Sequence, residues 1–207
     1  MTQSPVSSPA RDGLPPIAVL WPLMTALGAS IFGVLVYVIS NNNGDEFGRL
    51  VVAVLMGGLI VGWLEWQILR LYRIPIGFVW CGLNAGILVA IISALFHIDQ
   101  VVAGDTYWLL PVWGMILDGS RWWLLRSHFP KTWFWLFFCA LGWVVDIAIF
   151  FGVGIATIEL FEPELVFIAF NGAFNGAWIG LCRGIALMIM LRDRRRLATG
   201  NTAPAAS

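Results

Sequence analysis

Long apolar runs alternate with short polar segments along the whole chain. A transmembrane helix needs about 20 mostly apolar residues to cross about 30 Å of hydrocarbon. Six runs meet this length: about 15–40, 48–71, 74–97, 107–127, 131–157 and 164–191. The pattern predicts an all-α membrane protein with six transmembrane helices in one domain, residues 15–192. Residues 1–14 and the stretch after Leu197 are polar or of low complexity, and we expect disordered tails there. The predicted C-terminal tail as a whole, residues 193–207, is basic before it becomes disordered.

The composition supports the membrane class. Hydrophobic residues make up 59% of the chain and charged residues only 12%, which is too apolar for an ordinary soluble domain. The first apolar run is much longer than the core of 7–15 residues in a secretory signal, and its flank has one arginine balanced by one aspartate. We therefore expect this run to be retained as the first helix.

Charge is distributed unevenly between the two sets of connecting segments. The segments 41–48, 98–106 and 158–164 contain acidic residues and neither lysine nor arginine. The opposite set holds most of the basic residues: Arg11, Arg70, Arg73, Arg126, Lys131, Arg192, Arg194, Arg195 and Arg196. Because basic residues accumulate on the cytoplasmic side of a membrane, we expect both termini in the cytoplasm.

A motif recurs three times, which indicates internal repeats. PIAVLW, PIGFVW and PKTWFW each place a tryptophan five residues after a proline, at Trp21, Trp80 and Trp135. Arginines at Arg70, Arg126 and, less regularly, Arg183 end the units, which suggests three tandem two-helix hairpins over about 15–73, 74–129 and 130–192. We expect the tryptophans at the cytoplasmic interface, in an aromatic belt. Trp66, Trp122, Trp123 and Trp133 are further expected members of this belt.

Part of the first unit resembles a known kind of protein. The residues Gly58, Gly62, Glu65 or Gln67, Trp66, Leu69 and Arg70 follow the pattern G-x3-G-x2-[QE]-W-x2-LR. This pattern is similar to helices of uncharacterised bacterial membrane proteins familiar from cyanobacteria and Chloroflexota. The resemblance implies a membrane location and no established activity. We expect that membrane to be the bacterial inner membrane. Mitochondrial carriers are also triplicated hairpins, but the acidic and basic residues that follow their prolines are missing here.

Glycines recur at a spacing of four in several runs. Gly172, Gly176, Gly180 and Gly184 lie along one face of the last predicted helix. Gly58 with Gly62, and Gly82 with Gly86, repeat this spacing earlier in the chain. Such faces let helix backbones approach closely in lipid, so we expect these glycines to serve helix packing.

Matching stripes of residues suggest a polar cluster inside the bundle. Alignment of the units on their last arginines matches Glu65 with Arg121 and Trp178, and Gly62 with Asp118 and Asn175. If the three even-numbered helices surround one axis, Glu65 meets Arg121 with Trp178 as third member, and Asp118 meets Asn175. The cluster is either a pocket for an ion, a proton or a small solute, or a structural ion pair. A third alternative is that Glu65 and Arg121 each extend separately to the nearby interface.

Asp146 is a second polar candidate. It lies near the middle of the fifth run, where a carboxylate is costly and a functional role is the default hypothesis. It is protonated, paired with Arg121 or Arg183, or exposed to a water-filled path. We treat it as a candidate proton or ion site, with Arg183 as its candidate partner.

The sequence gives little support to other functions. Cys81, Cys139 and Cys182 stand singly in apolar runs, and neither histidine has a ligand partner at metal spacing, so no metal or other cofactor is expected. Asp118 begins a DGSR similar to the start of the CDP-alcohol phosphotransferase signature, but the later aspartates are missing, and there is no serine-protease motif or P-loop.

We therefore expect a non-enzymatic membrane protein with a carrier- or permease-like polar cluster for an ion or small solute. The alternative is an accessory or assembly subunit that docks lipid, pigment or another membrane protein. The expected partners are membrane lipids and, in the second case, another membrane protein, with no nucleic acid.

Overall fold

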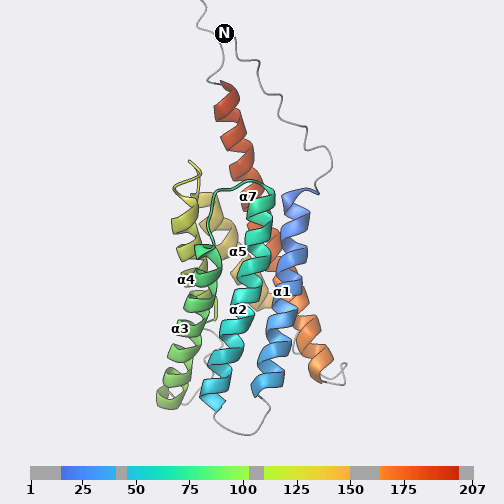
Figure 1. The fold of residues 1–207 in the computed structure, drawn as a ribbon, viewed down its shortest axis with the longest axis vertical. Coiled ribbons are helices and arrows are strands. Elements are labelled where there is room, and N and C mark those ends of the chain that lie inside the picture. The colour runs from blue at the N-terminus through green and yellow to red at the C-terminus, as the bar shows by residue number, and fades with distance from the viewer. Residues whose placement is uncertain (1–14, 41–45, 103–109, 150–163, 201–207) are drawn as a thin grey trace, which may run out of the picture.

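The protein is described by a computed structural model that covers residues 15–40, 46–102, 110–149 and 164–200. Every regular element in these ranges is an α-helix. The helices are α1 (Ile17–Ser40), α2 (Glu46–Leu71), α3 (Val79–Val102), α4 (Leu110–Leu125), α5 (Trp133–Ile149) and α7 (Glu164–Gly200) (Figure 1).

Several of these helices suit a membrane. Three of them, over Ile17–Ile39, Phe47–Leu71 and Glu164–Leu197, are long and apolar enough to cross a bilayer. Two shorter apolar stretches, Val79–Leu95 and Trp133–Ala148, lie in α3 and α5. The described part of α5 ends at Ile149, so the rest of the fifth predicted span, to residue 157, lies outside the described residues. The chain is therefore an all-helical protein with helices that can span a membrane.

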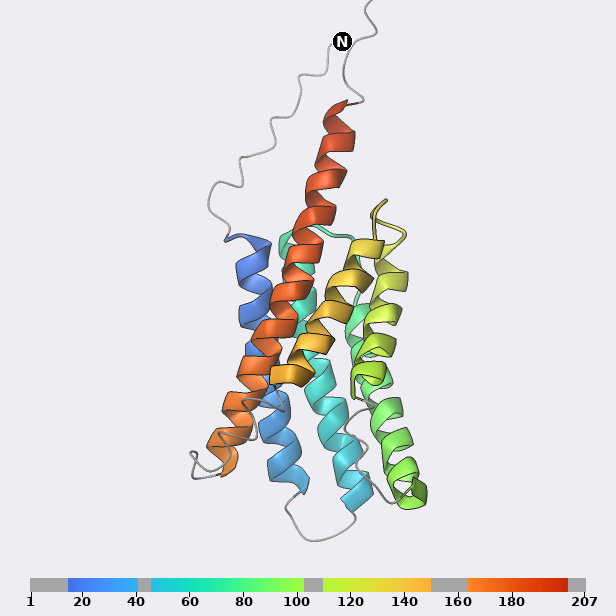
Figure 2. The ribbon, with the colours of Figure 1, turned by 180° about the vertical axis from the view of Figure 1, so that it is seen from behind.

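The helices pack in a closed ring in chain order. Each of α1 to α4 packs against the next helix, α5 packs against α7, and α7 packs against α1. The two opposite views show the helices side by side with their long axes roughly aligned (Figures 1 and 2). The ring encloses a core to which all six of these helices contribute side chains.

The start of α1 and the end of α7 lie at the same end of the ring (Figure 2). This end, called here the arginine-rich end, also carries the exposed side chains of Arg70, Arg73 and Arg126. Helix α7 extends beyond the ring to Gly200, so the expectation of disorder after Leu197 is wrong as far as residue 200. Arginine, leucine and alanine are strong helix formers, and they continue the helix where the apolar run stops. The other predicted tail residues, 1–14 and 201–207, lie outside the described residues.

A turn stabilised by backbone hydrogen bonds separates α2 from α3. Arg73 has a φ of 55°. The N–H of Ile74 donates to the carbonyl of Leu69 over 2.9 Å, and the N–H of Arg73 donates to that of Arg70 over 2.9 Å. This pair of bonds around a left-handed residue is the Schellman motif, which satisfies the last carbonyls of a helix. Pro75 follows two residues later, where it cannot continue the helix.

Trp21, Trp80 and Trp135, called here the tryptophan triad, meet in the core. All three have no exposed surface. Their rings contact one another edge to face, with centroids 6.2 to 6.3 Å apart and interplanar angles of 77° to 87°. Such aromatic pairs stabilise by about 0.5–1.5 kcal/mol beyond burial. The expectation that these three tryptophans lie at the interface is therefore wrong.

The four other tryptophans that were expected in the aromatic belt divide into two groups. Trp123 and Trp133 are more than half exposed, which agrees with an outer position, whereas Trp66 and Trp122 are partly buried against the core. The triad lies inside because it is on the faces of α1, α3 and α5 that point to the centre of the ring. A tryptophan five residues after a proline carries no information about that direction.

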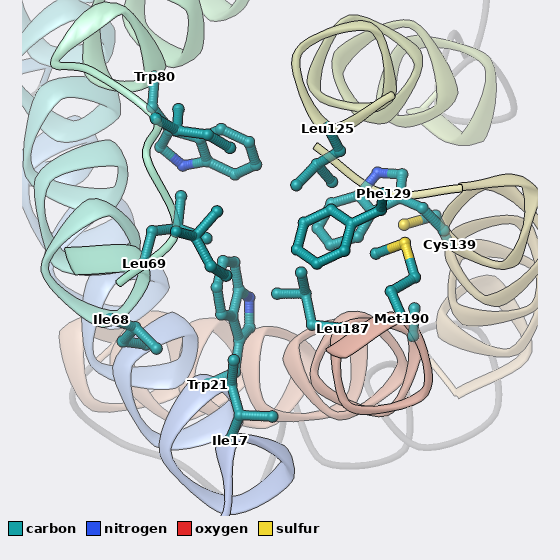
Figure 3. Packing of buried hydrophobic residues seen from close by; sticks show 14 residues of the cluster. Ile17, Trp21, Ile68, Leu69, Trp80, Leu125, Phe129, Cys139, Leu187 and Met190 are labelled. Carbon is teal, nitrogen blue, oxygen red and sulfur yellow. The ribbon is translucent and has the colours of Figure 1, made fainter. Parts of the chain in front are cut away.

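Three leucines extend the same core. Leu69, Leu125 and Leu187 have no exposed surface and belong to one cluster with the tryptophan triad. Figure 3 shows their side chains pointing into the space between the helices, with Phe129 and Met190 beside them. The arginine-rich half of the ring is thus filled by large apolar side chains.

Glycines allow the closest helix contacts. A Cβ atom added at Gly172 would lie 2.7 Å from the carbonyl oxygen of Ala29, and one at Gly176 would lie 2.7 Å from that of Thr25. The glycine stripe of α7 therefore packs directly on the backbone of α1. Gly82 and Gly86 differ, because a Cβ added at either would meet nothing within 4 Å. The expectation that these two glycines pack against a helix does not hold within the described residues.

This contrast predicts opposite effects of the same substitution. Gly176→Ala should destabilise the protein by about 1–3 kcal/mol, because the new methyl group overlaps the backbone of α1. Gly82→Ala is the matched control and should be neutral or slightly stabilising, since alanine is the better helix former. Thermal unfolding of both variants in mild detergent measures the difference. Equal unfolding temperatures would contradict the close α1–α7 contact.

Candidate functional site

Four charged side chains meet at the centre of the ring. Glu65 comes from α2, Asp118 and Arg121 from α4, and Arg183 from α7. Their exposed fractions are 0% for both carboxylates, 1% for Arg121 and 4% for Arg183. We call these four residues the charge cluster.

Each arginine of the charge cluster contacts both carboxylates. Arg121 lies 2.8 Å from Glu65 and 3.1 Å from Asp118. Arg183 lies 3.4 Å from Glu65 and 2.9 Å from Asp118. The cluster is therefore a closed cycle of four ion pairs with no net formal charge. A single charge in a membrane span costs about 2.5–3.5 kcal/mol on insertion scales, and mutual pairing offsets much of that cost.

The expected contact between Glu65 and Arg121 is present. Their burial also excludes the alternative in which the two side chains extend separately to the interface. The cycle links α2, α4 and α7, which are the second, fourth and sixth helices of the ring, through side chains that lie close to the axis of the ring. It thereby fixes the positions of these three helices relative to one another.

Neutral donors complete the surroundings of the carboxylates. Trp80 Nε1 donates to Glu65 Oε2 over 3.1 Å, and Trp143 Nε1 donates to Asp118 Oδ2 over 2.9 Å. Asn84 on α3 lies between the charges, where its Nδ2 donates to Glu65 over 3.5 Å and its Oδ1 accepts from Arg121 Nη2. Every carboxylate oxygen of the cluster therefore has at least one donor within the protein.

Sequence reasoning missed Asn84 as a member of this site. It is 1% exposed and lies four residues after Trp80, so the two side chains share one face of α3. Thr25 and Cys139 follow Trp21 and Trp135 at the same distance and are also buried. The position four residues after each of these tryptophans recurs in all three units, and this recurrence could have identified Asn84 as a buried residue.

Two of the expected members lie elsewhere. Asn175 does not meet Asp118, since its Nδ2 donates to Asn171 on the same helix over 3.2 Å. Trp178 does not join Glu65 and Arg121, since its Nε1 donates to the carbonyl of Gly142 over 3.2 Å. Arg183 takes the place that was expected for Trp178. It is buried, so it does not end the third unit at the interface as predicted.

The error arose from the alignment of the last unit. Glu65, Arg121 and Arg183 each precede a buried leucine by four residues, at Leu69, Leu125 and Leu187. Each also follows a glycine by seven residues, at Gly58, Gly114 and Gly176. Alignment on these leucines and glycines matches the three side chains that meet. Alignment on the last arginine shifted the third unit by five residues.

Asp146 lies apart from the charge cluster. None of the ion pairs between described residues includes it, and its buried Oδ1 has no hydrogen-bond partner among them. Neither Arg121 nor Arg183, its candidate partners, forms an ion pair with it. The buried Oδ1 of Asn175 also lacks a donor within the described part of the chain.

These two oxygens belong to packed helices. Gly142 on α5 faces Cys182 and Ile179 on α7, at 3.3 and 3.9 Å from an added Cβ. Asp146 and Asn175 follow one helical turn further from the arginine-rich end, on α5 and α7 respectively. These two positions thus present acceptor oxygens without donors among the described residues, whereas every carboxylate oxygen of the charge cluster has a donor.

Removal of one charge from the cluster should strongly destabilise the folded protein. Glu65→Gln leaves the buried Arg121 and Arg183 with one carboxylate between them, and such a change typically costs about 3–5 kcal/mol. Asp193→Asn is the control, because it removes a carboxylate that pairs over 3.0 Å with Lys131, a side chain that is 58% exposed. Pairs of this kind contribute about 0–1 kcal/mol.

The measurement is the unfolding temperature and the detergent-extracted yield of both variants. A loss for Glu65→Gln no larger than for Asp193→Asn would contradict the buried cycle. The exchange of Glu65 and Arg121 should recover little, since it creates like-charge contacts with Arg183 and Asp118.

The site contains no evident metal centre, as no group of three His, Cys, Asp or Glu residues in the described ranges is placed to hold an ion. Comparisons with protein-family models, with curated proteins and with solved structures gave no match to this chain. The function must therefore be inferred from the geometry of the site itself.

Proposed function

We propose that this chain is a non-enzymatic protein of the bacterial inner membrane, built from three tandem hairpins that cross the bilayer six times, with its arginine-rich end in the cytoplasm. The resemblance to uncharacterised bacterial membrane proteins belongs to the same proposal. Contacts that recur between the units support it. The tryptophan triad takes one residue from each unit, as do the three buried leucines.

The junctions between units give further support. Trp66, one residue after Glu65, donates from Nε1 to the carbonyl of Ile76 over 3.0 Å. Trp122, one residue after Arg121, donates from Nε1 to Thr132 Oγ1 over 3.0 Å. Each bond joins the end of one hairpin to the start of the next. Matching positions thus perform matching roles in the first two units.

The proposed activity is carrier-like, for an ion, a proton or a small solute. In this account the charge cluster and the apolar core close the bundle toward the arginine-rich end. Asp146 and Asn175 offer the acceptor oxygens to which a proton or cation binds. The observation that carries the proposal is the contrast between four charges that satisfy one another and a separate carboxylate on α5 whose buried oxygen has no donor within the described ranges.

A specific observation favours a second candidate, an accessory or scaffold protein that docks lipid, pigment or another membrane protein. The charge cluster is neutral and each of its carboxylate oxygens has a donor, so the two carboxylates need no cation or other ligand. On this reading the cycle only fixes the helices. The two candidates differ in whether Asp146 has a function that is separable from stability.

The six-crossing topology predicts how cysteines react in intact cells. Ser127→Cys, between α4 and α5, should resist a membrane-impermeant maleimide until the cells are permeabilised. Val102→Cys, at the far end of α3, should react from outside. The native cysteines Cys81, Cys139 and Cys182 are buried, so the background should be low. Reaction of Val102→Cys only after permeabilisation would overturn the orientation.

The carrier-like activity predicts a separable effect at Asp146. Vesicles that contain the purified protein and a trapped pH dye should show proton uptake after an acid pulse, or cation-dependent uptake with Na⁺ or K⁺. Asp146→Asn should abolish that flux with the unfolding temperature almost unchanged, because the carboxylate has no ion-pair partner among the described residues.

Asp193→Asn, which removes an outer carboxylate at the arginine-rich end, is the matched control and should retain full flux. No flux from the wild-type protein with any of the three ions, or flux that survives in Asp146→Asn, would reject this carrier mechanism and favour the scaffold.

A further inference from the structure

The three indoles of the tryptophan triad differ in their hydrogen bonds. Trp80 Nε1 donates to Glu65 Oε2 over 3.1 Å, and Trp135 Nε1 donates to the carbonyl of Asp118 over 3.0 Å. The Trp21 side chain has no exposed surface, and its Nε1 has no hydrogen-bond partner among the described residues. One buried donor of the three therefore lacks an acceptor.

The order of the helices in the ring explains the difference. Each indole that finds an acceptor finds it on the preceding helix: Trp80 of α3 on α2, and Trp135 of α5 on α4. The helix that precedes α1 in the closed ring is α7. Where α2 carries Glu65, α7 carries Arg183, and a guanidinium group donates hydrogen bonds but accepts none.

Trp21 and Arg183 occupy the same sector of the core. A Cβ added at Gly184, the residue after Arg183, would lie 3.3 Å from Trp21 Cβ. Leu187, one turn after Arg183, lies beside the Trp21 ring on the side of its nitrogen (Figure 3). Arg183 Nε is itself a buried atom without a partner among the described residues. Two buried donors thus belong to this sector, and neither has an acceptor within the described ranges.

The carboxylates of the charge cluster are already engaged. Glu65 binds both arginines and Trp80, and Asp118 binds both arginines and Trp143. A buried donor that loses its hydration without gaining a partner destabilises the folded state, and natural proteins commonly resolve this with an internal water. The missing acceptor must therefore come from outside the described side chains.

We propose that the core binds one small hydrogen-bond acceptor, of the size of a water molecule or a chloride ion, between Trp21 Nε1 and Arg183 Nε. The site lies between α1 and α7, and it takes an oxygen or halide acceptor because both protein groups are donors. It exists in the resting protein and does not depend on carrier activity. The ligand accepts the hydrogen bond of Trp21 Nε1, as Glu65 of the first unit accepts that of Trp80 and Asp118 of the second unit accepts that of Trp135.

The test compares three matched variants, Trp21→Phe, Trp80→Phe and Trp135→Phe, by thermal unfolding in detergent. All three lose the same bulk and the same ring contacts, so they differ mainly in the loss of the N–H group. If the site is occupied, Trp21→Phe should lower the unfolding temperature as much as Trp135→Phe does. If the site is empty, Trp21→Phe removes an unsatisfied donor, and its unfolding temperature should stay above that of both other variants by about 2–4 °C or more. The second result overturns the proposal.

Exchange of chloride for gluconate at equal ionic strength distinguishes the two ligands. A chloride-dependent rise in the unfolding temperature of the wild-type protein, absent in Trp21→Phe, identifies an anion, and equal temperatures identify water. Where the variants do not fold, the ¹⁵N–¹H indole spectrum of the wild-type protein serves instead. Trp113 Nε1 is another buried donor without a partner among the described residues, so the test uses the assigned Trp21 indole signal. The shift of a non-bonded N–H for Trp21 overturns the proposal, and a hydrogen-bonded shift supports it.

Discussion

Two carboxylates and two guanidinium groups share one buried space at the centre of this bundle, and each must be neutralised there. No single pair would suffice, since Glu65 lies between Arg121 and Arg183, and Asp118 lies between the same two arginines. The cycle therefore forms only when α2, α4 and α7 are all in place. Buried polar groups of this kind have been shown to specify one arrangement in some systems, and here they select which helices meet at the axis.

The rest of the core follows from that constraint. The tryptophan triad and Leu69, Leu125 and Leu187 fill the ring toward the arginine-rich end, and they keep water from the charges on that side. Close contact of α7 with α1 through glycines closes the ring. It also brings Arg183 to the axis. Packing and electrostatics thus depend on the same placement of α7.

The sequence predicted some of these features well. Apolar runs predicted helices at the right places, because a membrane helix requires a long uninterrupted run and tolerates few charges. The pairing of Glu65 with Arg121 followed from their matching positions in two units. Both predictions depend on the spacing of residues along the chain, which can be read directly from the sequence.

The features that failed depend on rotation and register. Trp21, Trp80 and Trp135 were expected at the interface, but the direction in which a helix face points is set by packing. Arg183 occupies the place that was predicted for Trp178. To predict this, the third unit had to be aligned with the correct offset, and the burial of Leu187, which identifies that offset, is seen only in the structure. Gly82 and Gly86 have the same spacing as the glycines of α7, yet they contact no other helix within the described ranges. Spacing alone does not identify the partner.

The central claim is that the charge cluster is one closed and self-compensating unit. The most direct test replaces all four members together, with Glu65→Gln, Asp118→Asn, Arg121→Met and Arg183→Met, and compares the unfolding temperature with those of the four single variants. Because no uncompensated charge remains, the account predicts that the quadruple variant unfolds closer to the wild-type temperature than any single variant does. A quadruple variant that loses at least the sum of the four single losses would contradict it.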